Sequence, residues 1–550
     1  MLNTKCAFLR RFKGSRAYFA AGERRRDESR RGTHECVRHV LLAALACGLA
    51  YGADWLTDGG NAQRTAWQQD EHILAKDNVK GLQILWKLQL DNKPREMHSL
   101  FAPLIVSGVP TAAGPKQIAI EAGISDNVYG IDVQTGKLIW EKHFEYPPIT
   151  EGRGLRPGDP LCPGGQTATP IIGPPGASGT RVAYAMAGNG EVHTLNVANG
   201  EEMAAPYKLG FGNGKNYALN LWNNVLFTTT SQGCNGNPNQ MWAVRVDDPD
   251  HKLMTASPKS GGLWGRTGAA IDSNGVAWAP TGDGRYEKET QTYGNGLIGA
   301  RVEGDKLNIV DYFIPSNWSW LQKRDLDFQV TPAIFTYKGK ELMATGSKEC
   351  RVYLLDPKDA GGEDHQTPLD RTPLMCNEEV NFASAGIWGS MATWEDAKGT
   401  RWLLVPFWGP VHPKFQVPVR HGPVTNGAVV AFKVEENGGK YKLVPAWISR
   451  DMNRAEPPVI ANGVIYAYGN GEYTEQAYAD RGLDDSSPLR IKNSTHAVLY
   501  ALDGETGAEL YSSGDQIASF AHFAGLSVAN GRVYLGTFDS ILYCFGLPGH

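Results

Sequence analysis

The sequence has 550 residues, of which 41% are hydrophobic and 20% are charged, and its net charge at pH 7 is -4. A slightly acidic chain provides no positive field for a polyanion, and no basic face interleaved with aromatic residues is present, so we expect no nucleic-acid partner. The 64 Gly, 32 Pro and 15 Trp favour many short strands joined by tight turns. The composition therefore predicts an all-β protein.

The N-terminal segment is the only strongly basic part of the chain. Its arginines precede an apolar run at residues 40–50, and small residues follow at Gly52 and Ala53. This order is the layout of a secretory signal peptide, and the run is shorter than the roughly 20 residues that span a bilayer. We expect residues 1–53 to be a leader cleaved near Gly52, which predicts a periplasmic or secreted protein with no transmembrane segment. Lipid attachment at Cys47 is a less favoured alternative, because residues 44–46 match a lipobox poorly.

From residue 54 onward the chain repeats one hairpin pattern. In residues 128–140 and 498–511 a strand ends at Ile-Asp or Leu-Asp, a Thr-Gly turn follows, and a second strand carries an aromatic residue. Weaker copies begin at Val192, Met241, Leu297, Val352, Val429 and Leu542. A second hairpin precedes most copies, often with Asn-Gly at its centre, so each unit has four strands. Eight units predict one eight-bladed β-propeller of four-stranded antiparallel blades over residues 54–550.

The last copy ends too close to the C-terminus to leave room for an outer strand. Residues 81–91 can supply this strand, with Trp86 in the position that Trp140 has in the first blade. A ring closed in this way leaves only short, protected strand edges. We therefore expect an N-terminal strand to complete the eighth blade.

Five cysteines follow the predicted leader, and the sequence alone leaves their pairing open. The strand order narrows the possible pairings of these cysteines. Cys162 and Cys234 fall on one rim of adjacent blades, while Cys350 and Cys376 flank neighbouring parts of the fifth blade. We expect these two pairs to form disulfides and Cys544, in the final strand, to be a buried free thiol.

The strand order also predicts where a binding site lies. In each blade the start of the innermost strand and the end of the second strand share one face, so residues there surround one mouth of the channel. The residues at these positions are Cys162, Trp264, His522, Cys234, Asp283, Lys348, Glu472 and Asp539. Two long insertions, residues 410–426 and 469–496, lie on the same face, where loops tend to carry binding. The histidines have no ligand spacing such as His-Glu-x-x-His, so we expect no histidine-based metal site.

Residues 55–67 and the repeats resemble the pyrroloquinoline quinone (PQQ) propeller superfamily, which includes alcohol and methanol dehydrogenases and a non-enzymatic outer-membrane assembly lipoprotein. The resemblance implies that Trp264, in GGLWGRTGAA, lies under the quinone ring and that Lys348, in GSKECRVYLLD, points at the quinone oxygens. Asp283, in APTGDGRYEK, stands at a calcium-ligand position. Residues 325–335 are similar to the family's Trp-Asp-x-Asp stretch.

The sequence departs from the family pattern in three places. Cys162 and Pro163 stand where the enzymes carry two adjacent cysteines, and Gly233 and Cys234 stand near the position of a calcium-binding Glu. Asn295 aligns with the catalytic Asp, and an amide cannot take a proton from an alcohol. Little PQQ-dependent alcohol oxidation is therefore expected.

Three hypotheses follow. The favoured one is an exported propeller that binds a small molecule, a glycan or a protein at its axial rim. The first alternative is an enzyme, a dehydrogenase that uses PQQ and Ca²⁺ in a modified site. It would need a separate electron acceptor, because the chain has no Cys-x-x-Cys-His motif for a c-type haem. The second alternative is an outer-membrane assembly scaffold.

Overall fold

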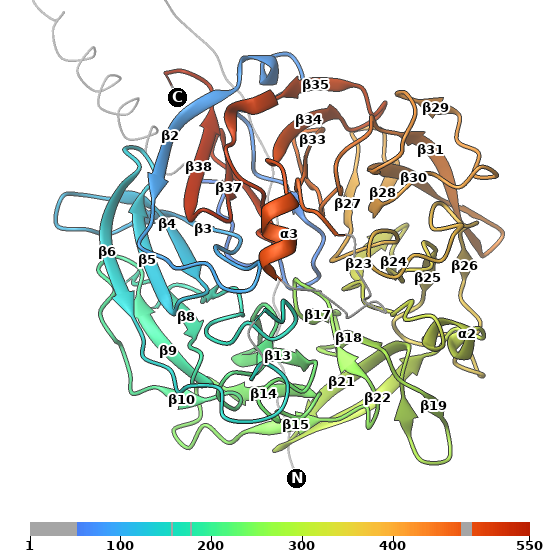
Figure 1. Ribbon diagram of the computed structural model, residues 1–550, viewed down its shortest axis with the longest axis horizontal. Helices are drawn as coiled ribbons and strands as arrows, with labels where there is room; N and C mark the ends of the chain where they lie inside the picture. The colour runs from blue at the N-terminus through green and yellow to red at the C-terminus, as the bar shows by residue number, and fades with distance from the viewer. Residues whose placement is uncertain (1–51, 156–157, 177–178, 475–486, 550) are drawn as a thin grey trace, which may run out of the picture. The chain divides into compact units, whose positions relative to one another are not determined.

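The structure is a computed structural model that describes residues 52–155, 158–176, 179–474 and 487–549. These residues form a ring of β-sheets around a central axis (Figure 1). Residues 1–51 lie outside the described residues, so leader cleavage near Gly52 and lipid attachment at Cys47 remain predictions. In the part of the chain that is described, no helix has the length and apolar character needed to cross a membrane.

The first four blades follow one another along the chain. Blade 1 consists of β3 (Leu104–Val109), β4 (Lys116–Gly123), β5 (Asn127–Asp132) and β6 (Lys137–His143). Blade 2 consists of β7 (Ile171–Ile172), β8 (Val182–Met186), β9 (Glu191–Asn196) and β10 (Tyr207–Lys208). Blade 3 consists of β11 (Lys215–Asn216), β12 (Asn220–Trp222), β13 (Val225–Ser231), β14 (Met241–Arg245) and β15 (Met254–Ala256). Blade 4 consists of β16 (Gly262–Leu263), β17 (Ala270–Ile271), β18 (Ala277–Gly282), β21 (Gly296–Glu303) and β22 (Lys306–Phe313), with the hairpin β19 (Tyr286–Glu287) and β20 (Thr292–Tyr293) inserted.

The other four blades complete the ring. Blade 5 consists of β23 (Ala333–Tyr337), β24 (Lys340–Gly346), β25 (Val352–Leu355) and β26 (Asp370–Arg371). Blade 6 consists of β27 (Ala392–Glu395), β28 (Arg401–Trp408), β30 (Gly427–Asn437) and β31 (Lys440–Ile448), with β29 (Val419–Arg420) added. Blade 7 consists of β32 (Val459–Ala461), β33 (Val464–Gly469), β34 (Val498–Asp503) and β35 (Glu509–Ser512), with β1 (Trp67–Gln68) on its inner edge. Blade 8 consists of β36 (Leu526–Ala529), β37 (Arg532–Gly536), β38 (Ile541–Gly546) and β2 (Gln83–Gln89).

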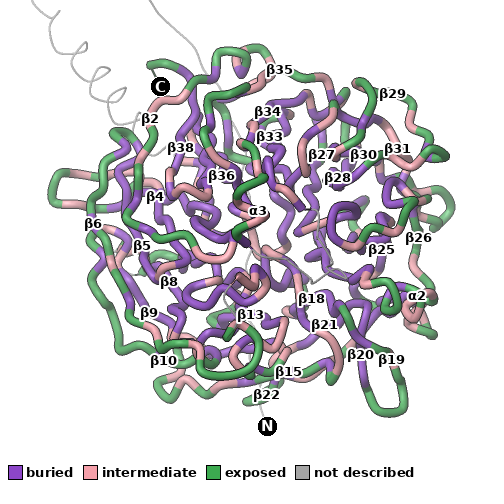
Figure 2. Tube along the Cα trace, viewed as in Figure 1, coloured by how far each residue is buried: buried purple, intermediate pink, exposed green. Residues whose placement is uncertain are grey.

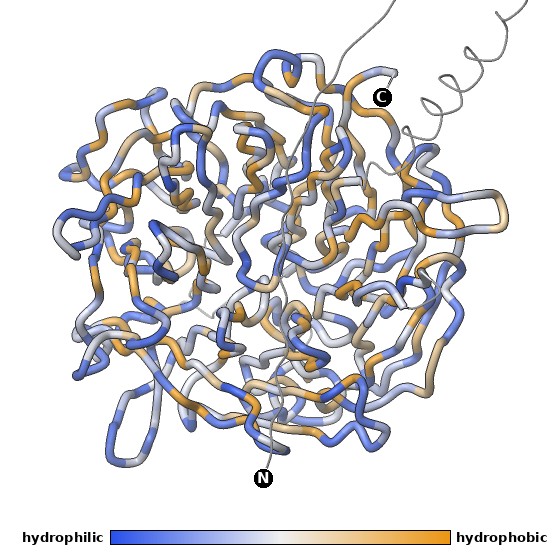
Figure 3. Tube along the Cα trace, turned by 180° about the vertical axis from the view of Figure 1, so that it is seen from behind, coloured by the Kyte–Doolittle hydropathy of each residue, from blue (hydrophilic) through white to orange (hydrophobic). Residues whose placement is uncertain are grey.

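This arrangement confirms the predicted eight-bladed propeller of mainly four-stranded antiparallel blades. The second and third strands are apolar on both faces because neighbouring blades cover both, and every residue of β28 is buried. The outer strands are more exposed, and every residue of β2 is exposed or partly exposed (Figure 2). Seen from behind, hydrophobic strands alternate with hydrophilic connections around the ring (Figure 3). Helices are short, namely α2 (Trp318–Gln322), α3 (Ser487–Asn493), η1 (Val79–Gly81) and η2 (Gly514–Gln516).

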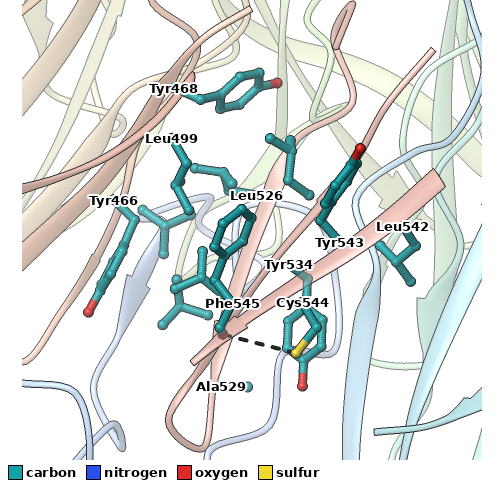
Figure 4. Packing of buried hydrophobic residues seen from close by; sticks show 14 of the residues in the cluster. Tyr466, Tyr468, Leu499, Leu526, Ala529, Tyr534, Leu542, Tyr543, Cys544 and Phe545 are labelled. Atoms are coloured by element: carbon teal, nitrogen blue, oxygen red, sulfur yellow. Dashed lines mark hydrogen bonds between the residues drawn. The ribbon is translucent and has the colours of Figure 1, made fainter. Parts of the chain in front are cut away.

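The ring closes where β2 pairs antiparallel with β38, in a register that runs from Gln83 opposite Gly546 to Gln89 opposite Ile541. The predicted N-terminal closing strand is thus confirmed. Next to this pair, Tyr534, Cys544 and Phe545 belong to one buried cluster (Figure 4). Cys544 is a buried free thiol, as expected.

A tryptophan joins one blade to the next, which explains the Thr-Gly turn and the aromatic residue of the repeat. The Nε1 of Trp86 donates to the carbonyl of Val133 at 2.9 Å, across the closure between blade 8 and blade 1. The Trp86 ring lies over Gly136 of the Thr-Gly turn, where an added Cβ would come within 2.6 Å of the ring. Trp140 makes the same pair of contacts with blade 2. The turn therefore needs Gly both for its positive φ and for this close approach.

The two predicted disulfides are present. Cys162 and Cys234 are bonded with their Cα atoms 5.5 Å apart, and Cys350 and Cys376 with theirs 5.4 Å apart. The first bridge links the loop before blade 2 to the loop after β13. The second fastens the start of β25 to the connection that follows blade 5.

Residues 53–68, here called the floor segment, contact the innermost strand of every blade. Six of its backbone carbonyls accept backbone hydrogen bonds, from blades 1, 2, 4, 5, 6 and 7, and the side chains of Arg64 and Gln68 donate to blades 3 and 8. In order from blade 1 to blade 8 the contacted residues are Ile105, Ile172, Leu219, Ile271, Ile334, Thr393, Ile460 and Val528. The floor segment therefore lies across the channel.

Candidate functional site

A cavity of about 320 Å³ lies in the axial channel on one side of the floor segment. Its lining comes from the loops before the innermost strands and after the second strands, as the strand order predicts. At its base, Arg266 forms an ion pair with Asp58 of the floor segment, with 2.6 Å between Nη1 and Oδ2. A cavity of this volume is large enough for a small-molecule ligand.

The structure brings four of the eight predicted rim residues to the lining of this cavity. Trp264, Asp283, Lys348 and His522 line it. Glu472 lies directly behind the lining, where its Oε2 is 2.5 Å from His522 Nδ1. The other three contribute less directly. The bridge between Cys162 and Cys234 fastens the loop that carries Leu161, and Leu161 lines the cavity. Asp539 is not among the lining residues.

Asn295 does not line the cavity. It is fully buried in a turn with a φ of 54°, where its Nδ2 donates to the carbonyl of Gly284 at 3.0 Å. The inserted hairpin β19–β20 carries the chain away from the mouth just before this position. Asn295 is therefore not among the residues that line this cavity, and its alignment with the catalytic Asp stays a prediction.

Three carboxylates form an acidic triplet on one wall of the cavity. Asp283, Asp325 and Asp327 each place a carboxylate oxygen within 4.8 Å of the other two. Lys348 Nζ lies 2.6 Å from Asp327 Oδ2 and 3.9 Å from Asp325 Oδ1. Sequence analysis selected Asp283 and Lys348 but not the other two. The sequence did contain a signal for them, because Asp325 and Asp327 form an Asp-x-Asp pair shortly before β23, the innermost strand of blade 5.

Local backbone geometry explains how these side chains meet. Asp283 and Asp325 both have positive φ, which turns the chain sharply after β18 and before β23. Gly282 leaves room for the side chains of Trp264 and Asp327. A Cβ there would lie 2.7 Å from Trp264 Nε1 and 2.9 Å from the Cβ of Asp327. Because only Gly avoids both contacts, this position lets an indole and two carboxylates share one corner.

The acidic triplet carries more negative charge than Lys348 can neutralise. Burial and the charge of Asp327 raise the pKa of Asp283, and burial together with Asp325 raises the pKa of Asp327. Burial alone would lower the pKa of Lys348, but the charges of Asp327 and Asp325 raise it above its usual value, so it stays protonated. Asp327 Oδ1 is buried with no hydrogen-bond partner among the described residues. The corner therefore favours a further cation.

Aromatic rings flank the acidic triplet. Lys348 Nζ lies 5.0 Å from the ring centre of Trp388, which stacks on Trp408 at 4.6 Å. Trp264 stands in the same cavity, and its buried Nε1 has no hydrogen-bond partner in the described part of the chain. Broad apolar faces next to charged groups suit a planar ligand that carries oxygen substituents.

Several basic residues also line the cavity. His98, Lys215, Arg490 and His522 all face the cavity, and the rings of the two histidines meet edge to face at 4.8 Å. Burial alone would raise the pKa of Glu472, but Arg490 and His522 hold it at about 2. These residues are spread over more than half of the chain, so only the fold shows that they lie together.

No family model and no curated protein matches the sequence. Among solved structures, a europium-containing methanol dehydrogenase aligns with 90% of this chain and 98% of its own, at 12% identity and a TM-score of 0.56. A quinohemoprotein alcohol dehydrogenase from Comamonas testosteroni aligns with 92% of this chain and 82% of its own, at 12% identity and a TM-score of 0.54. These matches show that the chain has the propeller fold of quinoprotein alcohol dehydrogenases, as the repeat predicts.

Proposed function

We propose that the axial cavity binds a metal ion on the acidic triplet beside a planar quinone such as PQQ, and that the protein is a quinoprotein-type oxidoreductase. The observation that carries this proposal is the meeting of Asp283, Asp325 and Asp327 with Lys348 and Trp264 in one cavity. Binding without turnover, at the same rim, is the second candidate. The loss of the adjacent cysteine pair favours that candidate, because Pro163 follows Cys162.

The donor set fits a hard cation. Carboxylate oxygens are the ligands that Ca²⁺ prefers, and three of them suit a trivalent ion even better because they carry more negative charge. The unpartnered Oδ1 of Asp327 provides an oxygen that no described residue uses. The aligned methanol dehydrogenase is described as containing europium. We therefore expect the acidic triplet to bind Eu³⁺ more tightly than Ca²⁺.

The surroundings also fit an anionic, planar quinone. Trp264 and Trp388 provide apolar faces, and Lys348 provides a protonated ammonium for quinone oxygens. When bound, PQQ supplies the acceptor for the two electrons of the oxidised substrate. The protein holds the reacting groups in a confined space, which removes the entropic cost of bringing them together.

Asp325 is the candidate proton acceptor. Its side chain is 47% exposed, whereas that of Asp327 is almost completely buried, so a substrate hydroxyl can reach Asp325. Burial raises the pKa of Asp325, and Lys348 opposes the rise. A carboxylate has two oxygens, so Asp325 can contact an ion with one and accept the hydroxyl proton with the other.

The proposed location is outside the cytoplasm. The two disulfides form and persist in oxidising compartments, which agrees with export of the chain. The proposed reaction requires a separate electron acceptor, because the sequence has no c-type haem motif.

The test is to incubate purified protein with PQQ and either Ca²⁺ or Eu³⁺, and to measure bound metal, quinone absorbance and dye-linked alcohol oxidation. Asp327→Asn should lose the metal. Asp325→Asn should keep the quinone but lose about 10² to 10⁴ in turnover, which is typical of a removed general base. Asp305→Asn, on the exposed Lys252 pair, is the matched control and should change neither property. Metal and quinone binding with no turnover would establish the second candidate, and failure to bind either would refute the proposal.

A further inference from the structure

Four basic residues of the cavity lining come from other parts of the ring than the acidic triplet. His98 precedes β3 of blade 1, Lys215 begins β11 of blade 3, Arg490 is in α3 and His522 precedes β36 of blade 8. The acidic triplet comes from blades 4 and 5, which lie opposite blades 8 and 1 of the two histidines, whereas blade 3, which carries Lys215, adjoins blade 4 (Figure 1). We call these four residues the basic wall.

Most of the charge near the basic wall is neutralised in pairs. Glu472 forms ion pairs with Arg490 and with His522. Arg153, which also lines the cavity, has its Nε 2.8 Å from Asp159 Oδ2. Each arginine thus has a carboxylate of its own.

Lys215 is the exception. It is only 9% exposed, and the contact of its Nζ is the carbonyl of Pro160 at 3.5 Å. Among the residues that the structure describes, no carboxylate lies within ion-pair distance of this ammonium. Burying an unpaired charge is unfavourable. Accordingly, burial lowers the pKa of Lys215 to about 7, although Asp159 opposes the effect.

Each of the two histidines has one ring nitrogen, Nε2, to which no described residue makes a hydrogen bond. His98 donates from Nδ1 to the carbonyl of Glu96 at 2.9 Å, and His522 donates from Nδ1 to Glu472. Each neutral ring then presents Nε2 as an acceptor. The basic wall therefore combines an unpaired ammonium with two acceptors that suit hydroxyl groups.

We infer that the basic wall binds the carboxylate of a hydroxy acid, with the carboxylate on Lys215 and hydroxyl groups on the imidazoles. A carboxylate would supply the counter-charge that Lys215 lacks, and a bound hydroxy acid has a further hydroxyl for the opposite wall. This inference rests on the proposed function for the reaction of that hydroxyl. Binding of the acid itself requires neither metal nor quinone.

The experiment measures binding of gluconate and of neutral sorbitol to the purified protein by calorimetry, without metal or quinone. Gluconate should bind and sorbitol should bind at least tenfold more weakly. Lys215→Met should weaken gluconate binding at least tenfold, while Lys215→Arg should retain most of it. Lys338→Met, which removes an exposed lysine paired with Glu436, is the matched control and should leave binding unchanged.

A thermal melt distinguishes loss of the site from loss of the fold. Lys215→Met should melt at least as high as the parent, because it removes an unpaired buried charge, and gluconate should raise the melting temperature of the parent only. Unchanged gluconate binding in Lys215→Met, or equal binding of sorbitol, would overturn the inference. If PQQ displaced gluconate, the carboxylate on Lys215 would belong to the quinone and the hydroxy-acid assignment would fail. If gluconate bound as expected while loaded protein oxidised no alcohol, only the oxidoreductase proposal would fail.

Discussion

Trp86→Ala should destabilise the ring at its closure by about 3 kcal/mol, the lower end of the range for removing a large aromatic side chain. The lower end applies because Trp86 is half-buried. Losing its indole does not leave the carbonyl of Val133 unpaired, because Arg532 Nη1 also donates to that oxygen at 3.0 Å. The expected cost is therefore the lost packing over Gly136 and against Tyr534, whose ring centre lies 6.1 Å away.

Trp140→Ala is the matched control, because Trp140 makes the same contacts one blade further along the chain. Trp140 is 8% exposed, so the variant should lose about as much or slightly more free energy of unfolding. The two variants should differ in local opening. Weakening β2 frees the edge of β38, because these two strands lie far apart in the sequence, whereas a short hairpin joins β6 to its neighbour β5.

Urea unfolding followed by circular dichroism measures the loss of stability in both variants, and brief proteolysis under native conditions measures local opening. We expect new cleavage between residues 69 and 103 in Trp86→Ala and not in Trp140→Ala. If Trp86→Ala unfolded at the same urea concentration as the parent and gained no cleavage site, the closure would not depend on this contact.

Three further predictions concern other parts of the fold. The double variant Cys162→Ser and Cys234→Ser should lose about 4 kcal/mol in the chain-entropy model, because the bridge spans 72 residues, and a urea midpoint equal to that of the parent would contradict this. Glu456→Gln should be more stable than the parent by about 4 kcal/mol at pH 8 but nearly equal at pH 4. The reason is that burial raises the pKa of Glu456 from 4.5 to about 8. The stability that the parent has below pH 4.5 is therefore lost as the pH rises from 4.5 through 8. Thermal melts of both proteins at pH 4 and pH 8 measure this difference. Cys544 should not react with a thiol reagent in the native protein and should react fully in urea, because it is buried and its pKa is raised to about 12.

The repeat made the fold predictable from sequence, and the strand order made part of the site predictable. Trp264 and Lys348 meet in the cavity because their positions in two adjacent blades place them on one face. The role of Lys215 could not be predicted from the strand order. It depends on the absence of a carboxylate within ion-pair distance among the described residues, which only the structure shows. The motif comparison did not show that Asn295 lies outside the cavity, because its burial in the turn after the hairpin β19–β20 is a property of the fold.

The floor segment follows the predicted cleavage site with almost no spacer, and its hydrogen bonds also seal the channel. The floor segment therefore closes one end of the channel, and in the described part of the chain the cavity opens only at the other end. In the proposed oxidoreductase reaction, reactant and product would use the same opening, so each turnover would have to empty the cavity before the next molecule enters. We expect product to compete with substrate for this entrance, and an electron acceptor to dock at the same rim.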